Sequence, residues 1–235
     1  MMGVAFMPAS DLKRRYNVIG HFYSLEVPRI ETVKCRSVLE ITFKAALTTE
    51  QKPTADAVFV MMNPGSSRPI VETDHAVSSD EISVMSAVLM PTVPDTTQYQ
   101  VMRIMHYMGW QHVRVINLSD LSDPKSGSFF KRYVQLESES GCTAHSVFSS
   151  QRSAELKQHL SRKPQGPIVC AWGVSAALSP LIERASAVLS LETAAIGLLK
   201  SGHPRKYFHP LPSLQSQKEQ WVAQMLELLH AQQSL

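Results

Sequence analysis

The chain has 235 residues, of which 44% are hydrophobic and 18% are charged, and its formal net charge is +3. This composition predicts a folded protein with a sizeable core and excludes a disordered or low-complexity chain. No apolar run approaches the roughly 20 residues that a membrane-spanning helix needs, and no export signal is recognisable. We therefore expect a cytoplasmic protein without membrane contact. The weak positive charge permits an acidic partner but does not require one.

Three cysteines, Cys35, Cys142 and Cys170, are scattered along the chain without a paired spacing. Such isolated cysteines are typical of a reducing compartment. They argue against a disulfide framework, a zinc knuckle or a four-cysteine iron–sulfur cluster. We expect no metal and no organic cofactor.

Strand-like and helix-like segments alternate after about residue 36. Short apolar or alternating runs predict strands, and apolar residues at helical spacing predict helices. In chain order we expect an outer strand at 36–45, a buried central strand at 57–62, a helix at 96–108, a strand at 112–117, a helix at 150–162, a strand at 167–171, a helix at 175–191, a strand at 194–199 and an amphipathic helix at 213–231.

This rhythm predicts an α/β fold, a three-layer sandwich with a mainly parallel central sheet flanked by helices. Residues 1–35 are less regular and are interpreted as an N-terminal extension, which leaves 36–235 as a single α/β domain. The segment 66–95 is long for a plain connection, and connections of that length are often functional.

Four polar motifs follow the predicted strands. Each has an ordinary explanation, because an Asn after a strand is often a turn residue, a His before Pro is often an exposed loop residue, and a Trp often packs in a core. Ligands of open α/β sheets bind at the carboxyl ends of the strands, so the four motifs together predict one site. In chain order they are Asn63-Pro64-Gly65, Asn117-Leu118-Ser119-Asp120, Trp172-Gly173 and Gly202-His203-Pro204-Arg205.

These motifs resemble those of the uracil-DNA glycosylase superfamily, in particular its mismatch-specific branch. Residues 62–67 are similar to that branch's Gly-Ile-Asn-Pro-Gly motif. Residues 113–118 resemble the strand whose final Asn reads the flipped pyrimidine, and residues 202–205 resemble the His-Pro-Ser-Pro loop. The resemblance spans roughly residues 56–210 and is carried by some fifteen positions. The chain also resembles a divergent bacterial and viral offshoot with the same Asn-Pro and Ser-Gly-His-Pro-Arg signatures.

The resemblance implies a role for each motif. Asn63 would position the attacking water, and His203 would hydrogen-bond the departing base. Asn117 would read the pyrimidine edge, because an amide offers both a donor and an acceptor. The other residues implied in substrate binding are Pro64, Gly65, Ser66, Asp120 and Trp172. The last loop departs from the family's Ser-Pro-Leu-Ser, and its residue types make Lys200, Arg205, Lys206 and Tyr207 candidates for DNA binding, with Tyr207 or Phe208 as a wedge between bases. A basic surface loop with buried aromatic residues explains them equally well.

The sequence also departs from the family pattern. The Tyr-His that usually follows the first motif, and bars thymine, is absent. Three aromatic residues are candidates for stacking on the base, and each is equally a core candidate: Tyr99, Tyr107 and Phe129. Asp74 or Asp80 would supply the carboxylate that Asn63 lacks, although a solvated loop explains both equally well. The departures point away from ordinary uracil and toward a roomier pocket.

The leading hypothesis is therefore a monofunctional DNA glycosylase that acts on a flipped modified or mismatched pyrimidine and leaves an abasic site. This hypothesis extends to a hydroxymethylated or glucosylated cytosine of phage DNA, excised as antiviral defence. The expected partner is DNA, with the protein as a monomer. One alternative is a non-catalytic nucleic-acid or nucleotide-binding module on the same fold, and another is a hydrolase of free nucleosides. No Gly-x-Ser-x-Gly elbow is present, which argues against a serine hydrolase.

Overall fold

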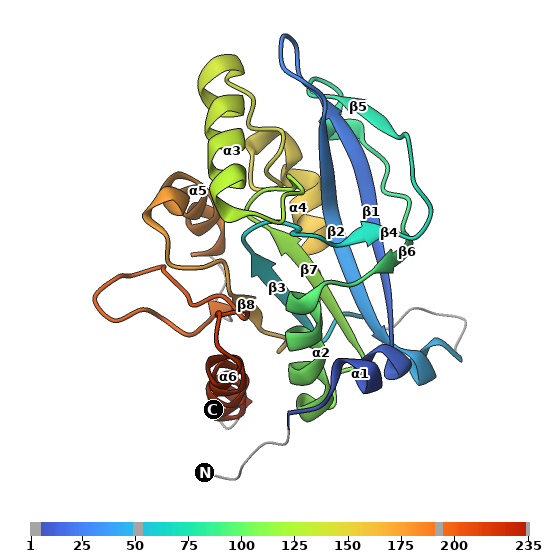
Figure 1. The fold of residues 1–235 in the computed structure, drawn as a ribbon, viewed down its shortest axis with the longest axis vertical. Coiled ribbons are helices and arrows are strands. Elements are labelled where there is room, and N and C mark those ends of the chain that lie inside the picture. Colours follow the sequence, from blue (N-terminus) through green and yellow to red (C-terminus); the bar gives the residue numbers. More distant parts are fainter. Residues whose placement is uncertain (1–5, 49–53, 191–194, 234–235) are drawn as a thin grey trace.

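The structure, a computed structural model, describes residues 6–48, 54–190 and 195–233. In these residues a nine-stranded sheet runs through the molecule, with helices on both faces (Figure 1). The strands are β1 (Tyr16–Glu26), β2 (Val33–Phe43), β3 (Ala57–Met61), β4 (Arg68–Pro69), β5 (Ala76–Ser78), β6 (Met90–Val93), β7 (His112–Asn117), β8 (Ile168–Cys170) and β9 (Ala195–Ile196). The α-helices are α1 (Ala9–Arg15), α2 (Thr96–Met108), α3 (Ser126–Ser140), α4 (Ser153–His159), α5 (Ser179–Leu189) and α6 (Gln215–Gln233). Four 3-10 helices are η1 (Lys44–Thr48), η2 (Ile82–Val84), η3 (Ser150–Arg152) and η4 (Ala176–Leu178).

The central strand β3 shows why the molecule has three layers. All five of its residues are buried, and its neighbours β7 and β8 both run parallel to it. Val58 and Val60 pack into the core on one face with α3, α4 and α5. Phe59 and Met61 pack into the core on the other face with α1, α2 and α6. A strand covered on both faces reads as a continuous apolar run, so the predicted central strand is confirmed.

The sheet is mixed, with the order β4-β6-β1-β2-β7-β3-β8-β9 and β5 paired to β1. The predicted α/β class with helices on both faces is confirmed. The prediction of a mainly parallel sheet describes only the half that contains β7, β3, β8 and β9. In the other half β1 and β2 are long antiparallel partners, and β2 is antiparallel to β7. The predicted outer strand at 36–45 therefore corresponds to β2, which lies inside the sheet between β1 and β7.

The segment predicted as an N-terminal extension contributes a strand to this sheet. Tyr16 to Leu25 pair with Phe43 to Val33 of β2, with one register shift after His21. The boundary placed at residue 35 thus falls within β2, and residues 1–5 lie outside the described part. A short connection joins the two strands, which is the geometry of a hairpin and not of a crossover.

Helix α2 has the bounds that its sequence predicts. The Asp95 carboxylate accepts hydrogen bonds from the backbone N–H groups of Thr97 (2.9 Å) and Gln98 (3.2 Å), and the Gln98 side chain accepts from the Asp95 N–H. This capping box satisfies N–H groups that have no partner inside the helix. Gly109 ends the helix with a φ of 67°, a conformation that favours glycine.

The remaining predicted elements differ from the structure mainly at their ends. The predicted helix at 150–162 comprises η3 and α4, and the one at 175–191 comprises η4 and α5, with residue 191 outside the described part. The predicted strand at 194–199 is represented by the short β9, with residue 194 also outside it. Helix α3 was not predicted. Among the described residues, the structure contains no helix that is both long and apolar enough to span a bilayer.

Candidate functional site

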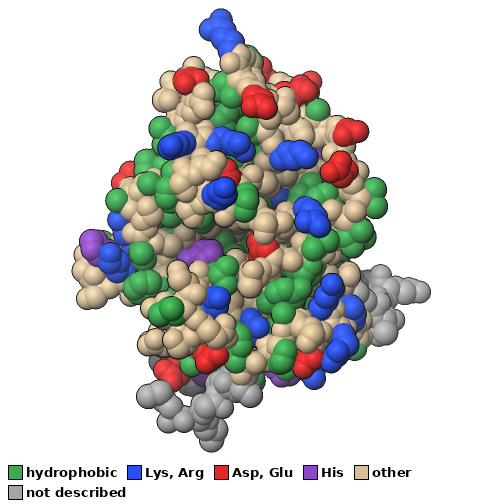
Figure 2. Space-filling view, viewed as in Figure 1, with side chains coloured by type: hydrophobic (Ala, Val, Ile, Leu, Met, Phe, Trp, Pro, Cys, Tyr) green, Lys and Arg blue, Asp and Glu red, His purple; other side chains and the backbone are tan. Residues whose placement is uncertain are grey.

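A cavity of about 450 Å³ opens at the sheet edge where the parallel strands β7, β3 and β8 end. Its walls are the turn after β3, the start of α2, the segment before α3, the loop after β8 and the residues before α6. Figure 2 shows a depression near the centre of the viewed face, with Lys and Arg side chains on the surrounding surface. The cavity brings together Asn63, Pro64, Gly65, Ser66 and Trp172 of the predicted site.

Asn63 is held in one orientation by its side-chain nitrogen. This nitrogen donates to the main-chain oxygens of Leu121 (3.2 Å) and Asp123 (2.7 Å). Both N–H groups of the amide are therefore used within the protein. The side-chain oxygen has no hydrogen-bond partner among the described residues, so it is left as an acceptor at the cavity. An acceptor of this kind can orient a water molecule.

The turn that follows Asn63 packs closely against the cap of α2. Gly65 has a φ of 67°, and a Cβ at this position would lie 2.7 Å from Asp95 Oδ2. A glycine is therefore required both by the backbone conformation and by the close approach of the carboxylate. Asp95 and Asp123 are the carboxylates that line the cavity among the described residues. The predicted carboxylates Asp74 and Asp80 are exposed and lie outside it.

Asn117 is fully buried beneath the turn and is absent from the cavity wall formed by the described residues. In the orientation that satisfies both ends of its amide, its nitrogen donates to Asn63 O (3.2 Å) and its oxygen accepts from Arg36 Nη2 (3.3 Å). Its contacts therefore brace the first motif from below. The predicted role in reading a base edge requires a side chain that a ligand can reach.

Asp120 is also fully buried, three residues farther along the chain. Its carboxylate accepts from Arg152 Nη1 (2.6 Å) and from the Tyr23 hydroxyl (2.8 Å). Burial raises the pKa of Asp120, against the opposing effect of the Arg152 charge. Asp120 is not part of the cavity wall in the described residues. It belongs to an internal ion pair below the site.

Trp172 forms a wall of the cavity and anchors the loop that carries the fourth motif. Its indole N–H donates to Arg205 O (2.9 Å), and its ring meets the Tyr207 ring edge-on, with 5.2 Å between centroids. The Gly173 N–H donates to Tyr207 O (2.9 Å). Tyr207 is therefore half-buried against this wall, whereas Phe208 is 45% exposed.

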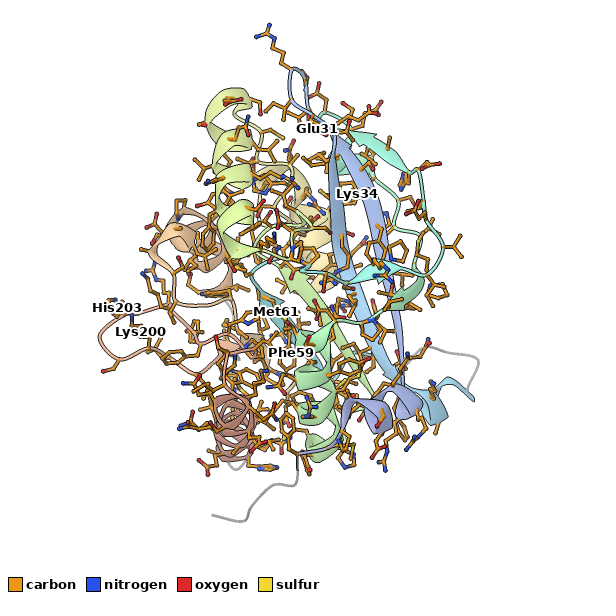
Figure 3. All side chains as sticks on the ribbon, viewed as in Figure 1. Glu31, Lys34, Phe59, Met61, Lys200 and His203 are labelled. Atoms are coloured by element: carbon orange, nitrogen blue, oxygen red, sulfur yellow. The ribbon has the colours of Figure 1, made fainter. Side chains whose placement is uncertain are left out.

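The fourth motif projects away from the cavity. In Figure 3 the labelled His203 lies at the outer end of a protruding loop, Lys200 lies closer to its base, and Met61 and Phe59 lie in the centre of the molecule. Lys200 N–H donates to Lys206 O (2.8 Å), which closes the loop at its base. His203 and Arg205 are exposed, while Lys200 and Lys206 are partly covered. The structure thus does not bring His203 to the cavity with Asn63.

A different histidine lines the cavity. His209 is followed by Pro210, and the backbone N–H of Leu211 donates to His209 Nδ1 (3.2 Å). This bond places the ring proton on Nε2. Burial lowers the pKa of His209 to about 4, so the ring is neutral at neutral pH. The cavity therefore has a neutral N–H donor that the sequence interpretation missed, although a second His-Pro pair at 209–210 was its signal.

None of the three aromatic residues predicted to stack on a base lines the cavity formed by the described residues. Phe129 is fully buried in the core between the sheet and α3, and Tyr99 and Tyr107 pack on the opposite core. Phe130, the next residue on α3, is half-buried and lines the cavity together with Leu178. Phe130 is thus, together with Trp172, an aromatic side chain of the wall that a flat ligand can contact.

Ser119, His145 and Glu137 form a row of side chains that resembles a hydrolase triad. Ser119 Oγ lies 2.8 Å from His145 Nδ1, and His145 Nε2 lies 3.0 Å from Glu137 Oε1. Here the serine faces Nδ1 and the carboxylate faces Nε2, whereas in a serine hydrolase the serine faces Nε2 and the carboxylate faces Nδ1. Ser119 and His145 are fully buried, so the row has a structural role.

The described residues contain no cluster of three or more His, Cys, Asp or Glu side chains arranged to hold a metal ion. Comparison with known proteins gives no further assignment for this site. No protein-family model matches the chain, and neither a curated protein nor a solved structure matches it.

Proposed function

We propose that this protein is a monofunctional DNA glycosylase of the uracil-DNA glycosylase type, acting on a flipped modified or mismatched pyrimidine. One observation carries the proposal. A single cavity at the strand ends contains a fixed amide acceptor, Asn63, and a neutral histidine donor, His209. Cleavage of an N-glycosidic bond needs an acceptor to orient water at the sugar and a donor where charge develops on the base.

In the proposed reaction Asn63 Oδ1 orients a water molecule toward C1′ of the deoxyribose. The bond between C1′ and the base nitrogen breaks, and its electron pair leaves with the base. The water oxygen bonds to C1′, and the proton that it loses ends on the departed base. His209 Nε2–H donates to a base oxygen as negative charge develops there. An amide is a weak base, so Asn63 positions the water and catalysis is slow.

We expect the protein to release the base without cutting the DNA strand. Bifunctional glycosylases use an amine nucleophile, and the described residues of the cavity wall include no lysine. An abasic site is therefore the expected product.

The protruding loop at residues 200–206 is proposed to hold the DNA backbone. Lys200, Arg205 and Lys206 supply cations for phosphates. His203 belongs with them at the loop surface and not with the chemistry. The exposed Phe208 is the better candidate for a wedge between bases, because Tyr207 is packed against Trp172.

The size of the cavity favours a modified base. Its volume of about 450 Å³ lies in the range of pockets that hold drug-sized ligands, roughly 300–1,000 Å³. An unmodified pyrimidine ring is small for such a space. We therefore propose hydroxymethylated or glucosylated cytosine as the substrate class, which would place the enzyme in defence against phage DNA.

The experiment is a base-release assay on DNAs that contain uracil, mismatched thymine, hydroxymethylcytosine or glucosylated hydroxymethylcytosine. Abasic sites are detected by alkaline cleavage. We expect release from at least one DNA by the wild type and a loss of about 100-fold or more in Asn63→Ala. Asn17→Ala, on β1 away from the cavity, is the matched control. Equal release by wild type and Asn63→Ala would contradict the proposed site.

A non-catalytic binding module is the second candidate. It is favoured by the weak basicity of Asn63, because a carboxylate at this position would be a stronger base than an amide. DNA binding that survives in the absence of release from every DNA of the panel would support this module.

A further inference from the structure

Arg36 on β2 is a buried cation without a carboxylate partner. Its side chain is 1% exposed, and no carboxylate of the described residues lies within salt-bridge distance. The carboxylates that act on it most strongly are Asp95 and Asp120, and Asp120 is already paired with Arg152. Burial lowers the pKa of Arg36 to about 10, which still leaves it charged at neutral pH. A buried charge of this kind is costly unless something compensates it.

The hydrogen bonds of Arg36 do not provide that compensation. Nη1 lies 3.4 Å from Pro64 O, and Nη2 lies 3.3 Å from Asn117 Oδ1. Both acceptors are neutral and both contacts are long for N–H···O bonds. Nε has no partner in the described residues.

Arg103 provides an internal comparison, because it is also a buried arginine without a salt bridge in the described part of the chain. It donates to Met7 O (2.9 Å) and Gln100 Oε1 (2.8 Å), and its guanidinium lies 3.7 Å from the centroid of the Phe6 ring. The donors of Arg103 thus have short contacts and an aromatic face. Arg36 has neither.

The position of Arg36 indicates that its charge acts on a ligand in the cavity. It lines the cavity beneath the turn at 63–65 and is the only arginine or lysine in the wall formed by described residues. The titratable groups that share the wall are Asp95, Asp123 and His209, and His209 is neutral. A negatively charged group in the cavity therefore has one cation to meet, on the β2 side.

We infer that Arg36 stabilises the negative charge that a pyrimidine carries as it leaves the sugar. This inference deepens the proposed function and rests on it. When the bond between C1′ and the base nitrogen breaks, the electron pair remains on the base and is shared with its oxygen. His209 donates a hydrogen bond to this anion, and Arg36 supplies the full positive charge that a neutral histidine cannot. The substrate class is thus a base that departs as an anion and not as a protonated, neutral ring.

The test measures binding of two free pyrimidines. 5-Nitrouracil ionises at mildly acidic pH because of its nitro group, whereas thymine stays neutral there. We expect the wild type to bind 5-nitrouracil at least about tenfold more tightly above the pKa of the ring than below it, with no such change for thymine. Arg36→Gln is expected to lose this preference. Arg36→Lys is expected to keep part of it, and the control Arg103→Gln all of it.

Several outcomes would overturn the inference. One is a wild type that binds neither pyrimidine, and another is an unchanged anion preference in Arg36→Gln. If Arg36→Gln does not fold, Arg36→Met replaces it; failure of both neutral variants to fold would show that the charge serves the fold. Base release without anion preference would overturn this inference and leave the glycosylase proposal standing. Anion preference without base release from any DNA would overturn the glycosylase proposal and with it the catalytic role of Arg36, and would leave Arg36 only as a cation that binds anionic ligands.

Discussion

The orientation of the Asn63 side chain is set by the contacts of its amide nitrogen. Because its two N–H groups point at the main-chain oxygens of Leu121 and Asp123, its oxygen is the atom left for a ligand. A carboxylate is a stronger base, but at this position it would face two carbonyl oxygens without a proton to donate. The local backbone therefore selects an amide over an acid.

This geometry predicts the effect of Asn63→Asp. We expect a loss of about 1–3 kcal/mol in the free energy of unfolding at neutral pH, because two buried acceptors lose their donor and meet a negative charge. The loss should shrink at low pH, where the carboxyl group is protonated and can donate again. Urea denaturation at neutral and acidic pH measures both values. Unchanged stability at neutral pH would show that the amide contacts do not hold the turn.

Helix α3 packs on the core through Phe129, Tyr133 and Leu136, and one of its carboxylates also links it to α5. Glu137 accepts hydrogen bonds from Arg184 of α5 (2.8 and 3.1 Å) and lies 3.0 Å from His145 Nε2. Burial alone would raise the pKa of Glu137, but these hydrogen bonds and the Arg184 charge outweigh it and lower the pKa to about 2. The contacts tie α3 to α5.

A lowered pKa in the folded state implies stability that is lost in acid. The contribution of Glu137 is fully present above its ordinary pKa of 4.5 and disappears as the pH falls through about 2. We expect Glu137→Gln to lower the free energy of unfolding by about 1–3 kcal/mol at neutral pH and to flatten its pH dependence in that window. Glu139→Gln, exposed on the same helix, is the control. Identical acid profiles for the two variants would contradict this role.

The elements that the sequence predicted well have local signals. Helix α2 is bounded by an Asp cap and a Gly stop, and β3 is a short run of buried residues. Helix α3 was missed although Phe129, Tyr133 and Leu136 have helical spacing, because polar residues dominate the rest of it. The strand β1 was missed because it is defined by its pairing with β2, which a local pattern does not show. The antiparallel hairpin of β1 and β2 belongs to the half of the sheet that was not predicted.

Within the site, sequence reasoning located the strand ends but not the side-chain directions. Asn63 and Trp172 follow their strands directly and reach the cavity. Asn117 is the last residue of β7, yet its side chain turns inward, a direction that residue order does not encode. His209 reaches the cavity and His203 does not, because the loop at 200–206 folds back before His209. Contacts of Tyr207 with Gly173 and Leu199 fix that point.

At the scale of the whole molecule, the proposed function divides between a cavity and a basic loop. The cavity carries Asn63 and His209, whereas the loop carries Lys200, Arg205 and Lys206. These two parts are expected to respond differently to salt. Phosphate contacts weaken with ionic strength, while the chemical step in the cavity does not depend on them.

The loop makes the salt dependence of DNA binding testable. We expect the double variant Arg205→Gln, Lys206→Gln to weaken DNA binding and to reduce the slope of log K against log salt by up to about 2, near 0.9 for each lost phosphate contact. Lys157→Gln, exposed on α4, should leave the slope unchanged. Fluorescence anisotropy with a labelled duplex across a salt series gives the slopes. Equal slopes in all three proteins would exclude the loop from the DNA interface.

The central claim is that the cavity histidine acts in the chemistry and the loop histidine does not. The most direct measurement is the rate of base release under single-turnover conditions, with protein in saturating excess, for His209→Gln and His203→Gln. The account predicts that His209→Gln lowers the rate about 100- to 1,000-fold, as expected for loss of one donor to developing charge, while His203→Gln leaves it nearly unchanged. A rate that falls in His203→Gln and survives in His209→Gln would contradict the account.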